Sequence, residues 1–478
     1  MKRKNSLLLA IAAVALTLGA CDRKGQVDDG GGNGGGNGVQ YVELTGNLST
    51  QTLTADKKYL IKGQVFVQNG QTLTIEPGTV VFGEKRTKGT LIINRGGKIM
   101  AEGTLARPIV FTSNQAPGDR DRGDWGGLVI LGNASTNQID PAIEGISPKV
   151  PFGGNPANTE SSNTPNDADN SGVLTYVRVE FAGIEISPNN ETNSITMGGV
   201  GRGTKMENCM VSYGGDDGFE WFGGTVNGKN FISFNSWDDD FDVDFGYSGN
   251  VQFGVAVRYP SYADQSESNI FECDNGPNDN DVQPYTTGTF SNFTGIGPIK
   301  TGNRVGNANF KHAVDLRRRT AVSIVNSVFV GMPIGLRMNQ PSVLAQYTAN
   351  RGIIGNNIII SPANFATGSG VTVDGISAYL SANGNTVTVE SNFTDATWST
   401  LGINPDLVYG SRIDDQYPTN PNFAVTSGTL TSGANFSYAK FSEANRTGFF
   451  QTVAYRGAFG STDWTDGWAE FNPVNKTY

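Results

Sequence analysis

The sequence contains a single histidine, His312, among 478 residues. Hydrolases of the Ser-His-Asp and Cys-His types, and zinc or iron sites rich in histidine, each need a histidine within reach of its partners. Only one such site could therefore exist in this chain, and no motif for one surrounds His312. We expect His312 to have a structural role.

Charged residues are also scarce, at 17% of the sequence, whereas a typical soluble domain has about 25%. The chain is rich in turn residues, with 63 Gly and 20 Pro, and 10% of it is aromatic. This composition excludes a helical bundle and a coiled coil, and it argues against disorder along the whole chain. Acidic residues outnumber basic ones by 45 to 35, a net charge of −10. Because no Lys/Arg run could follow a phosphate backbone, we expect no nucleic-acid partner.

The first twenty residues differ from the rest of the chain. A basic start, Met1–Lys4, precedes an apolar run over Leu7–Leu18, which is shorter than the roughly 20 residues of a membrane span and fits a secretory signal. The run ends in Leu18-Gly19-Ala20-Cys21, which resembles the lipobox of bacterial lipoproteins, where cleavage before the cysteine is followed by its acylation. We therefore predict a lipoprotein signal over residues 1–20 and membrane lipid attached to Cys21, with an ordinary signal peptide as the alternative.

Residues 21–40 are rich in glycine and predict a flexible tether between the lipid and the body. Acidic residues shortly after Cys21 resemble the surface-export signals of Bacteroidota-type lipoproteins, which implies an outer-membrane lipoprotein at the cell surface. The alternative is retention at the inner membrane, which Asp22 directly after the cysteine signals in other bacteria, so the sequence leaves the membrane leaflet open. The two remaining cysteines, Cys209 and Cys273, could form one disulfide or stay as buried free thiols.

From Tyr41 onward, short β-rich runs alternate with Gly, Asn and Pro, which predicts all-β structure. Residues 208–224 repeat at 230–246 with a spacing of 22. The matching pairs are Asn208/Asn230, Asp216/Asp238, Asp217/Asp239, Phe219/Phe241, Glu220/Asp242 and Gly224/Gly246. A period of about 22 with three short strands per turn is typical of a right-handed parallel β-helix, in which rungs stack about 4.8 Å apart around an apolar shaft.

The opening runs at residues 59–82 and 103–128 resemble the first rungs of pectate-lyase-like β-helix proteins. The chain from about residue 40 to the end, including residues 215–226 and the closing Gly457–Trp468 segment, is similar to a mostly uncharacterised family of Bacteroidota outer-membrane-associated lipoproteins. This resemblance implies one β-helix domain over residues 41–478. We expect loop excursions near residues 137–175 and 275–290, and a C-terminal cap in which Trp464 and Trp468 cover the open end of the shaft.

The one chemical feature of the repeat is a ladder of acids. Because side chains alternate along a strand, Phe219 and Trp221 facing inward place Glu220 outward, and Asp242 follows on the next rung. Stacked carboxylates at about 5 Å cost about 3 kcal/mol per pair at an effective dielectric near 20, so the ladder needs a cation, an Arg or Lys partner, or raised pKa values. Oxygen ligands without histidine or cysteine suit Ca²⁺. The predicted ligands are Asp216, Asp217, Glu220, Asp238, Asp239 and Asp242; the alternative is that these acids only cap turns.

The repeated Asp-Asp-x-Phe-Asp/Glu spacing is similar to the calcium motif of family nine polysaccharide lyases, which use a lysine as the base. No lysine of this chain matches that role, and the run Arg317–Arg319 is expected several rungs away, solvated or paired with Asp315. We therefore expect a non-enzymatic protein that binds a glycan or assists an outer-membrane transporter, with Trp237 and Tyr247 as ligand contacts. A calcium-dependent lyase for acidic glycans and an adhesin-like structural module are the alternatives.

Overall fold

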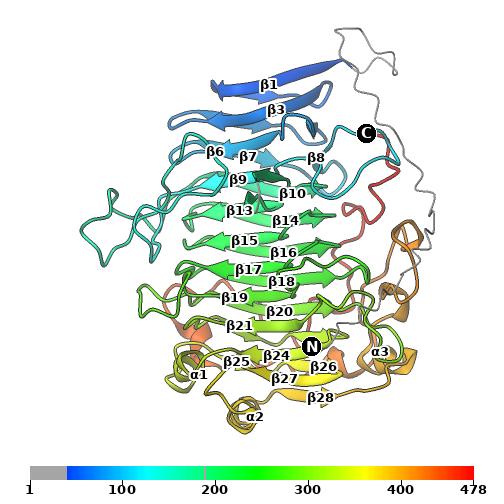
Figure 1. Cartoon of the computed structure of the whole chain (residues 1–478). Coiled ribbons are helices and arrows are strands. Elements are labelled where there is room, and N and C mark those ends of the chain that lie inside the picture. Colours follow the sequence, from blue (N-terminus) through cyan, green and yellow to red (C-terminus); the bar gives the residue numbers. More distant parts are fainter. Residues whose placement is uncertain (1–39, 188–189) are drawn as a thin grey trace, which may run out of the picture. The chain divides into compact units, whose positions relative to one another are not determined.

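The short β-rich runs of the sequence form the rungs of a parallel β-helix. The computed structural model describes residues 40–187 and 190–478. The predicted signal, Cys21 and the tether up to residue 39 lie outside this part. In the unit Tyr41–Tyr478, 26 strands form one connected network in which every ladder is parallel. Figure 1 shows the rungs stacked from β1 at one end to β28 at the other. The predicted all-β solenoid is confirmed.

The strands stack in three faces, here called sheets A, B and C. Sheet A contains all or part of β1 (Tyr41–Leu48), β3 (Lys58–Val67), β5 (Val80–Gly83), β8 (Ile109–Ser113), β10 (Gly172–Glu180), β14 (Lys205–Ser212), β16 (Asn227–Phe234), β18 (Asn250–Val257), β20 (Thr289–Ile296), β23 (Val328–Val330), β26 (Ile358–Ser361) and β28 (Thr386–Val389).

Sheet B begins with the second halves of β1 and β3 and continues through β6 (Thr90–Ile93), β9 (Leu128–Leu131), β13 (Ile195–Gly198), β15 (Phe219–Phe222), β17 (Phe241–Asp244), β19 (Phe271–Cys273), β21 (His312–Leu316), β24 (Ile334–Met338) and β27 (Ala363–Thr367). Sheet C contains β2 (Gln51–Leu53), β4 (Thr72–Ile75), β7 (Lys98–Glu102), the first halves of β10, β14, β16, β18 and β20, then β22 (Ser323–Val325) and β25 (Ile354–Gly355).

The few other elements lie outside the three sheets. They are the hairpin β11 (Glu185–Ser187) and β12 (Asn190–Glu191), the helices α1 (Pro341–Thr348), α2 (Val373–Ala382) and α3 (Asp395–Leu401), and the 3₁₀ turns η1 (Pro405–Leu407), η2 (Asp414–Gln416), η3 (Thr429–Thr431) and η4 (Ala439–Ser442).

The spacing of 22 residues sets the register of the central rungs. Phe219 pairs with Phe241 and Glu220 with Asp242. The chain bends from sheet C into sheet A at residues with left-handed backbone conformations, including Asn208 (φ 53°) and Asn230 (φ 59°). Asparagine tolerates this conformation better than most residues, and Asn230 Nδ2 donates to Asn208 Oδ1 at 3.0 Å. The repeated asparagines therefore mark a corner of the β-helix.

Three apolar clusters stabilise the unit: one inside the shaft, one on the outer face of sheet A, and a smaller one where the segment between β9 and β10 packs on sheet B. Inside the shaft, aromatic rings stack from rung to rung, with centroids 5.8 Å apart for Phe219 and Phe241 and 5.0 Å for Phe241 and Phe271. Outside it, the segment after α3 covers the outer face of sheet A, where Phe234 packs against Tyr417 and Phe471. In Figure 1 the red C-terminal part of this segment runs along one side of the rungs.

Trp464 and Trp468 belong to that lateral covering. Trp468 is buried, lies edge-to-face with Tyr176 and accepts a hydrogen bond from Arg178 through its carbonyl oxygen. The expected closure of the open end by these tryptophans is therefore wrong. At the β27 end, α2 packs on the shaft instead, with Ile376 and Leu380 buried in the core. The outer face of sheet A is apolar, and the C-terminal segment covers it.

Candidate functional site

A continuous ladder of side chains runs down the outer face of sheet B. Parallel pairing places Thr196 of β13 beside Glu220 of β15, and Glu220 beside Asp242 of β17. The same ladder continues through Glu272, Asp315 and Arg337. Neighbouring strands lie about 4.8 Å apart, so each ladder carboxylate has another charged residue one rung away. The structure thus confirms the register on which the acidic ladder was predicted.

The predicted turn acids lie immediately before β15 and β17. The backbone N–H of Asp239 donates to Asp217 Oδ1 at 2.8 Å, and the backbone N–H of Asn269 donates to Asp239 Oδ1. One oxygen of each of these two carboxylates therefore caps a turn, as the alternative prediction expected. Within residues 40–187 and 190–478, no ion pair joins Asp217, Asp239, Glu220 or Asp242 to a lysine or arginine. These hydrogen bonds order the turns, but they do not neutralise the negative charge of the four carboxylates.

Burial and nearby carboxylates raise the pKa values of Asp217, Glu220, Asp238, Asp239 and Asp242. The pKa of each of Asp217, Glu220 and Asp239 lies well above the usual range, first because burial removes water and then because other carboxylates are close. Burial likewise raises the pKa of Asp242 to about 7 and that of Asp238 to about 6. At neutral pH the site must either keep protons or attract a cation.

Arginines neutralise the other end of the ladder. Arg317 contacts Glu272 and lies bidentate on Asp274, with Nε at 3.1 Å from Oδ1. Arg337 Nε donates to Asp315 Oδ1 at 2.7 Å. Arg317 follows β21, which lies two rungs beyond β17. Its ion pairs are with Glu272 and Asp274, so the expectation that it pairs with Asp315 is wrong. The ladder therefore has a compensated lower part and an acidic upper part.

Three groups of carboxylates, in the acidic part and at its border with the compensated part, could hold a metal ion, since one oxygen from each residue of a group lies within 4.8 Å of the others. They are Asp216, Asp217 and Asp238; Asp217, Glu220 and Asp242; and Asp239, Asp242 and Glu272. Buried oxygens of Asp238 and Asp242 (Oδ1 in both) have no hydrogen-bond partner among the described residues. All six predicted ligands fall within these groups.

Glu272 is the residue that the prediction missed. It follows Phe271 as Asp242 follows Phe241, and the two acids pair across β17 and β19. The signal was the recurrence of Phe-acid-x-acid at residues 271–274. A longer turn after β18 shifts this recurrence to a spacing of 30 residues, outside the period of 22.

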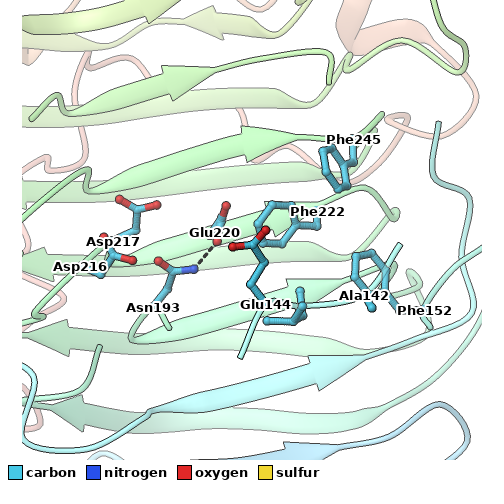
Figure 2. Close-up of a pocket in the computed structure, with 10 residues that line it drawn as sticks. Ala142, Glu144, Phe152, Asn193, Asp216, Asp217, Glu220, Phe222 and Phe245 are labelled. Atoms are coloured by element: carbon cyan, nitrogen blue, oxygen red, sulfur yellow. Dashed lines mark hydrogen bonds between the residues drawn. The ribbon is translucent and has the colours of Figure 1, made fainter. Parts of the chain in front are cut away.

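A cavity of about 290 Å³ opens beside Asp216, Asp217 and Glu220. Its opposite wall comes from the segment between β9 and β10, which contributes Glu144 together with Ala142, Ile143 and Phe152. Figure 2 shows the acids and Asn193, which donates to Glu220, on one side of this cavity, and the rings of Phe152, Phe222 and Phe245 on the other. The cavity thus combines a polar end with an apolar wall.

The two predicted ligand-binding aromatics lie in different environments. Trp237 is half-buried beside Tyr262, with centroids 5.4 Å apart, and its Nε1 donates to Asp264 at 3.2 Å. Tyr247 is fully buried in the shaft and donates its hydroxyl to the carbonyl oxygen of Val226 at 2.7 Å. A surface ligand cannot reach Tyr247, so its prediction as a ligand contact is wrong.

The remaining candidate residues have structural roles. His312 is buried with Nδ1 at 2.9 Å from Asn269 Oδ1, and burial lowers its pKa to about 3, so the ring is neutral. Cys209 and Cys273 are both buried free thiols, and burial raises the pKa of each. Among the described residues, no helix is both long and apolar enough to cross a membrane.

Comparison with known proteins gives one match. A family model described as a pectate-lyase like beta helix domain matches residues 46–401. No curated protein and no solved structure matches the chain. The matched range contains the whole outer ladder of sheet B, both its acidic part and its compensated part.

Proposed function

The chain belongs to the pectate-lyase-like β-helix family, and on this basis we propose that it is a non-catalytic glycan-binding lipoprotein of the outer membrane whose acidic rungs bind Ca²⁺. The observation that carries the proposal is the acidic part of the ladder. The carboxylates of Asp217, Glu220, Asp239 and Asp242 meet there, the first two beside a cavity. In the part of the chain that the structure describes, no ion pair joins these four to an arginine or lysine.

The donor set supports a hard cation. Carboxylate oxygens alone converge in the three groups, and Ca²⁺ prefers such oxygen ligands. Asp217 and Asp242 would hold the ion most centrally, because each belongs to two groups. Bound Ca²⁺ would neutralise carboxylates whose pKa values are otherwise raised, and it would tie together the consecutive rungs β15, β17 and β19.

The cavity supports binding of a sugar. Asn193 and Glu144 offer hydrogen-bonding groups, and the rings of Phe152 and Phe222 offer an apolar wall against which the C–H face of a sugar can pack. Trp237, at the turn that leads to Asp238, is a further half-buried aromatic residue on the same rungs. Such a pairing of a few polar groups with apolar walls is typical of small-molecule sites.

The residues that line the cavity do not favour lyase chemistry. A β-elimination on a uronate needs a base that removes the proton next to the carboxylate. In the related lyases this base is a lysine, and no lysine lies among the described residues that line the cavity. The lining side chains are carboxylates, Asn193 and apolar groups. We therefore favour binding over turnover and keep the lyase as an outcome of the test.

The test measures glycan retention and turnover together. The protein is applied to an array of neutral and acidic glycans with Ca²⁺ or with EDTA, and the same samples are monitored for the ultraviolet absorbance of unsaturated uronate. We expect retention that falls in EDTA and in Asp242→Asn, no absorbance change, and unchanged retention in the control Glu102→Gln, an exposed acid on β7. Calcium-dependent absorbance would establish the lyase instead. Absence of both signals would refute the proposal and favour an adhesin or a transporter partner.

The membrane location is tested separately. Acylation of Cys21 predicts that the chain sediments with outer membranes and that Cys21→Ser releases it. Protease treatment of intact cells then distinguishes a surface location from a periplasmic one.

A further inference from the structure

A second, larger cavity lies away from the acidic ladder, between the rungs and the C-terminal covering. Its volume is about 760 Å³. The turns that follow β18 and β20 form one wall, with Pro260, Pro298 and Lys300, and residues 409–416 form the other. We call it the cationic cavity. Its size is in the range of cavities that hold small molecules.

Positive charge converges on this cavity in a chain that is acidic as a whole. Lys300, Arg304 and Arg412 line it, and Asp395 is the one acid among the lining residues. In the described part of the chain, the side chains of Lys300 and Arg304 make no ion pair and no hydrogen bond. Arg412 is engaged by Asp406, with Nη1 at 2.6 Å from its carbonyl oxygen. Two cations are therefore available to a ligand.

The backbone that carries these cations is anchored. Gly302 and Phe393 exchange two backbone hydrogen bonds, at 2.8 and 2.7 Å. The carbonyl oxygen of Lys300 accepts a hydrogen bond from the buried Trp398 at 2.9 Å. The aliphatic stem of Lys300 also packs against Gly410, whose φ of 63° and close approach leave little room for a side chain. The cavity is thus built jointly by the β-helix and the C-terminal segment.

Neutral donors complete the lining. The exposed side chains of Thr301, Ser411 and Gln416 border the same space, and none of them has a hydrogen-bond partner within the described residues. Guanidinium and ammonium groups together with hydroxyl and amide donors form the donor set that recognises oxyanions.

We propose that the cationic cavity binds a sugar-sized ligand through an oxyanion group, a sulfate, phosphate or carboxylate, held by Lys300 and Arg304. The cavity is too large for the oxyanion alone, and the remaining space accommodates the body of the ligand against Pro260 and Pro298. This site does not depend on a cation in the acidic ladder. It would give the protein two binding sites of opposite charge.

The test is calorimetric titration of the full chain at low ionic strength with four probes: glucose 6-sulfate, glucose 6-phosphate, inorganic sulfate and glucose. We expect the two charged sugars to bind and glucose not to bind. Affinity falls as NaCl is added, because salt screens the attraction. Lys300→Met and Arg304→Met each weaken binding roughly ten- to hundredfold, the size expected for a lost charged hydrogen bond.

The matched controls are Lys57→Met and Arg107→Met, two exposed cations at the other end of the β-helix, which leave the affinity unchanged. If inorganic sulfate binds as tightly as glucose 6-sulfate, the body of the ligand contributes nothing, and the cavity is a site for a free anion; this result overturns the sugar-sized part of the proposal. As a second measurement, the charged sugar protects Lys300 from acetylation, detected by mass spectrometry. Equal affinities in Lys300→Met, Arg304→Met and the unmodified protein, or no binding of any anionic probe, would overturn the proposal. EDTA does not change these titrations, so their failure is distinct from failure of the calcium site.

Discussion

Replacing Asp242 by asparagine isolates the charge at the centre of the acidic ladder. Asp242 belongs to two of the three carboxylate groups, so its oxygens lie within 4.8 Å of those of Asp217, Glu220, Asp239 and Glu272. The substitution keeps the size and shape of the side chain and removes one negative charge. It therefore changes the electrostatics with little change in packing.

Two effects of Asp242→Asn can be estimated. Without a divalent cation at pH 8, each ionised neighbour at about 5 Å contributes a repulsion of about 3 kcal/mol at an effective dielectric near 20. Unfolding entropy of roughly 2.1 cal/mol/K per residue makes 1 kcal/mol equal to about 1 °C in a unit of this length. With one neighbour ionised, the variant melts about 3 °C above the unmodified protein in EDTA. Saturating Ca²⁺ at 100 times its Kd stabilises the unmodified protein by about 2.7 kcal/mol, again about 3 °C.

The assay is differential scanning calorimetry of both proteins in EDTA and in Ca²⁺. The calcium-induced shift of about 3 °C in the unmodified protein falls below about 1 °C in Asp242→Asn, whose melting temperature in EDTA is already raised. Glu102→Gln serves as the control and changes neither value. A variant that melts lower than the unmodified protein in EDTA, or that keeps the full calcium shift, would refute the argument that the stacked acids repel one another and bind the ion.

Three further predictions follow from the same electrostatics and packing. The pKa values of Asp238 and Asp242 are raised to about 6 and about 7 in the folded protein, so the folded protein holds protons that the unfolded chain has released. In EDTA the melting temperature therefore falls as the pH rises from about 4 to 7, while the calcium-induced shift grows. A melting temperature that rises over this pH interval would contradict the raised pKa values. Arg317→Met leaves Glu272 buried without a cation, whereas Asp274 keeps its ion pair with Arg318. Calorimetry in EDTA should therefore show a loss of about 3–5 kcal/mol, the cost of breaking one buried ion pair, and an unchanged melting temperature would show that this ion pair is not needed. Trp237→Ala reduces glycan retention on the array, whereas Tyr247→Phe leaves it unchanged. Tyr247→Phe lowers the free energy of unfolding by about 1 kcal/mol, because one hydrogen bond is lost. Equal retention in both variants would exclude Trp237 from the site.

The fold could be predicted because repetition made the register visible. Each residue of β15 has its partner 22 positions later in β17, so one alignment of two rungs located the shaft-facing rings of Phe219 and Phe241. The same alignment placed Glu220 and Asp242 outward. A comparison of adjacent rungs was sufficient, because in a β-helix the strands of each rung pair only with those of the neighbouring rungs.

The prediction for Tyr247 failed where the strand ends. Alternation of side chains holds only within Phe241–Asp244. Phe245 and Gly246 then take left-handed conformations, with φ of 52° and 85°, and the turn redirects the following side chain into the shaft. The backbone N–H of Tyr247 donates to the carbonyl oxygen of Asp244 at 3.1 Å, which closes this turn. The alternation of inward and outward side chains along a strand does not predict which way a side chain points after the turn.

The lateral position of Trp464 and Trp468 and the cavity beside the acids could not be predicted for another reason. Both depend on contacts between segments far apart in the sequence. The backbone N–H of Asn137 donates to the carbonyl oxygen of Phe245, and its side chain donates to the carbonyl oxygen of Asn275, at 2.9 and 2.7 Å. Segments without periodicity show in sequence that they leave the β-helix, but they do not show which rungs they return to.

The excursion between β9 and β10 also explains why the acids need compensation. The outer ladder of sheet B begins with apolar residues, Phe66, Ile92 and Val129, which pack with Ile143 and Phe152 of the excursion. Docked there, the excursion crosses onto the rungs β15 and β17 and contributes to the cavity wall beside the acids. Carboxylates on an open face would be solvated and would repel one another weakly, since water screens them. The apolar start of the ladder thus positions the segment that removes water from its acidic part, and this burial makes a bound cation favourable.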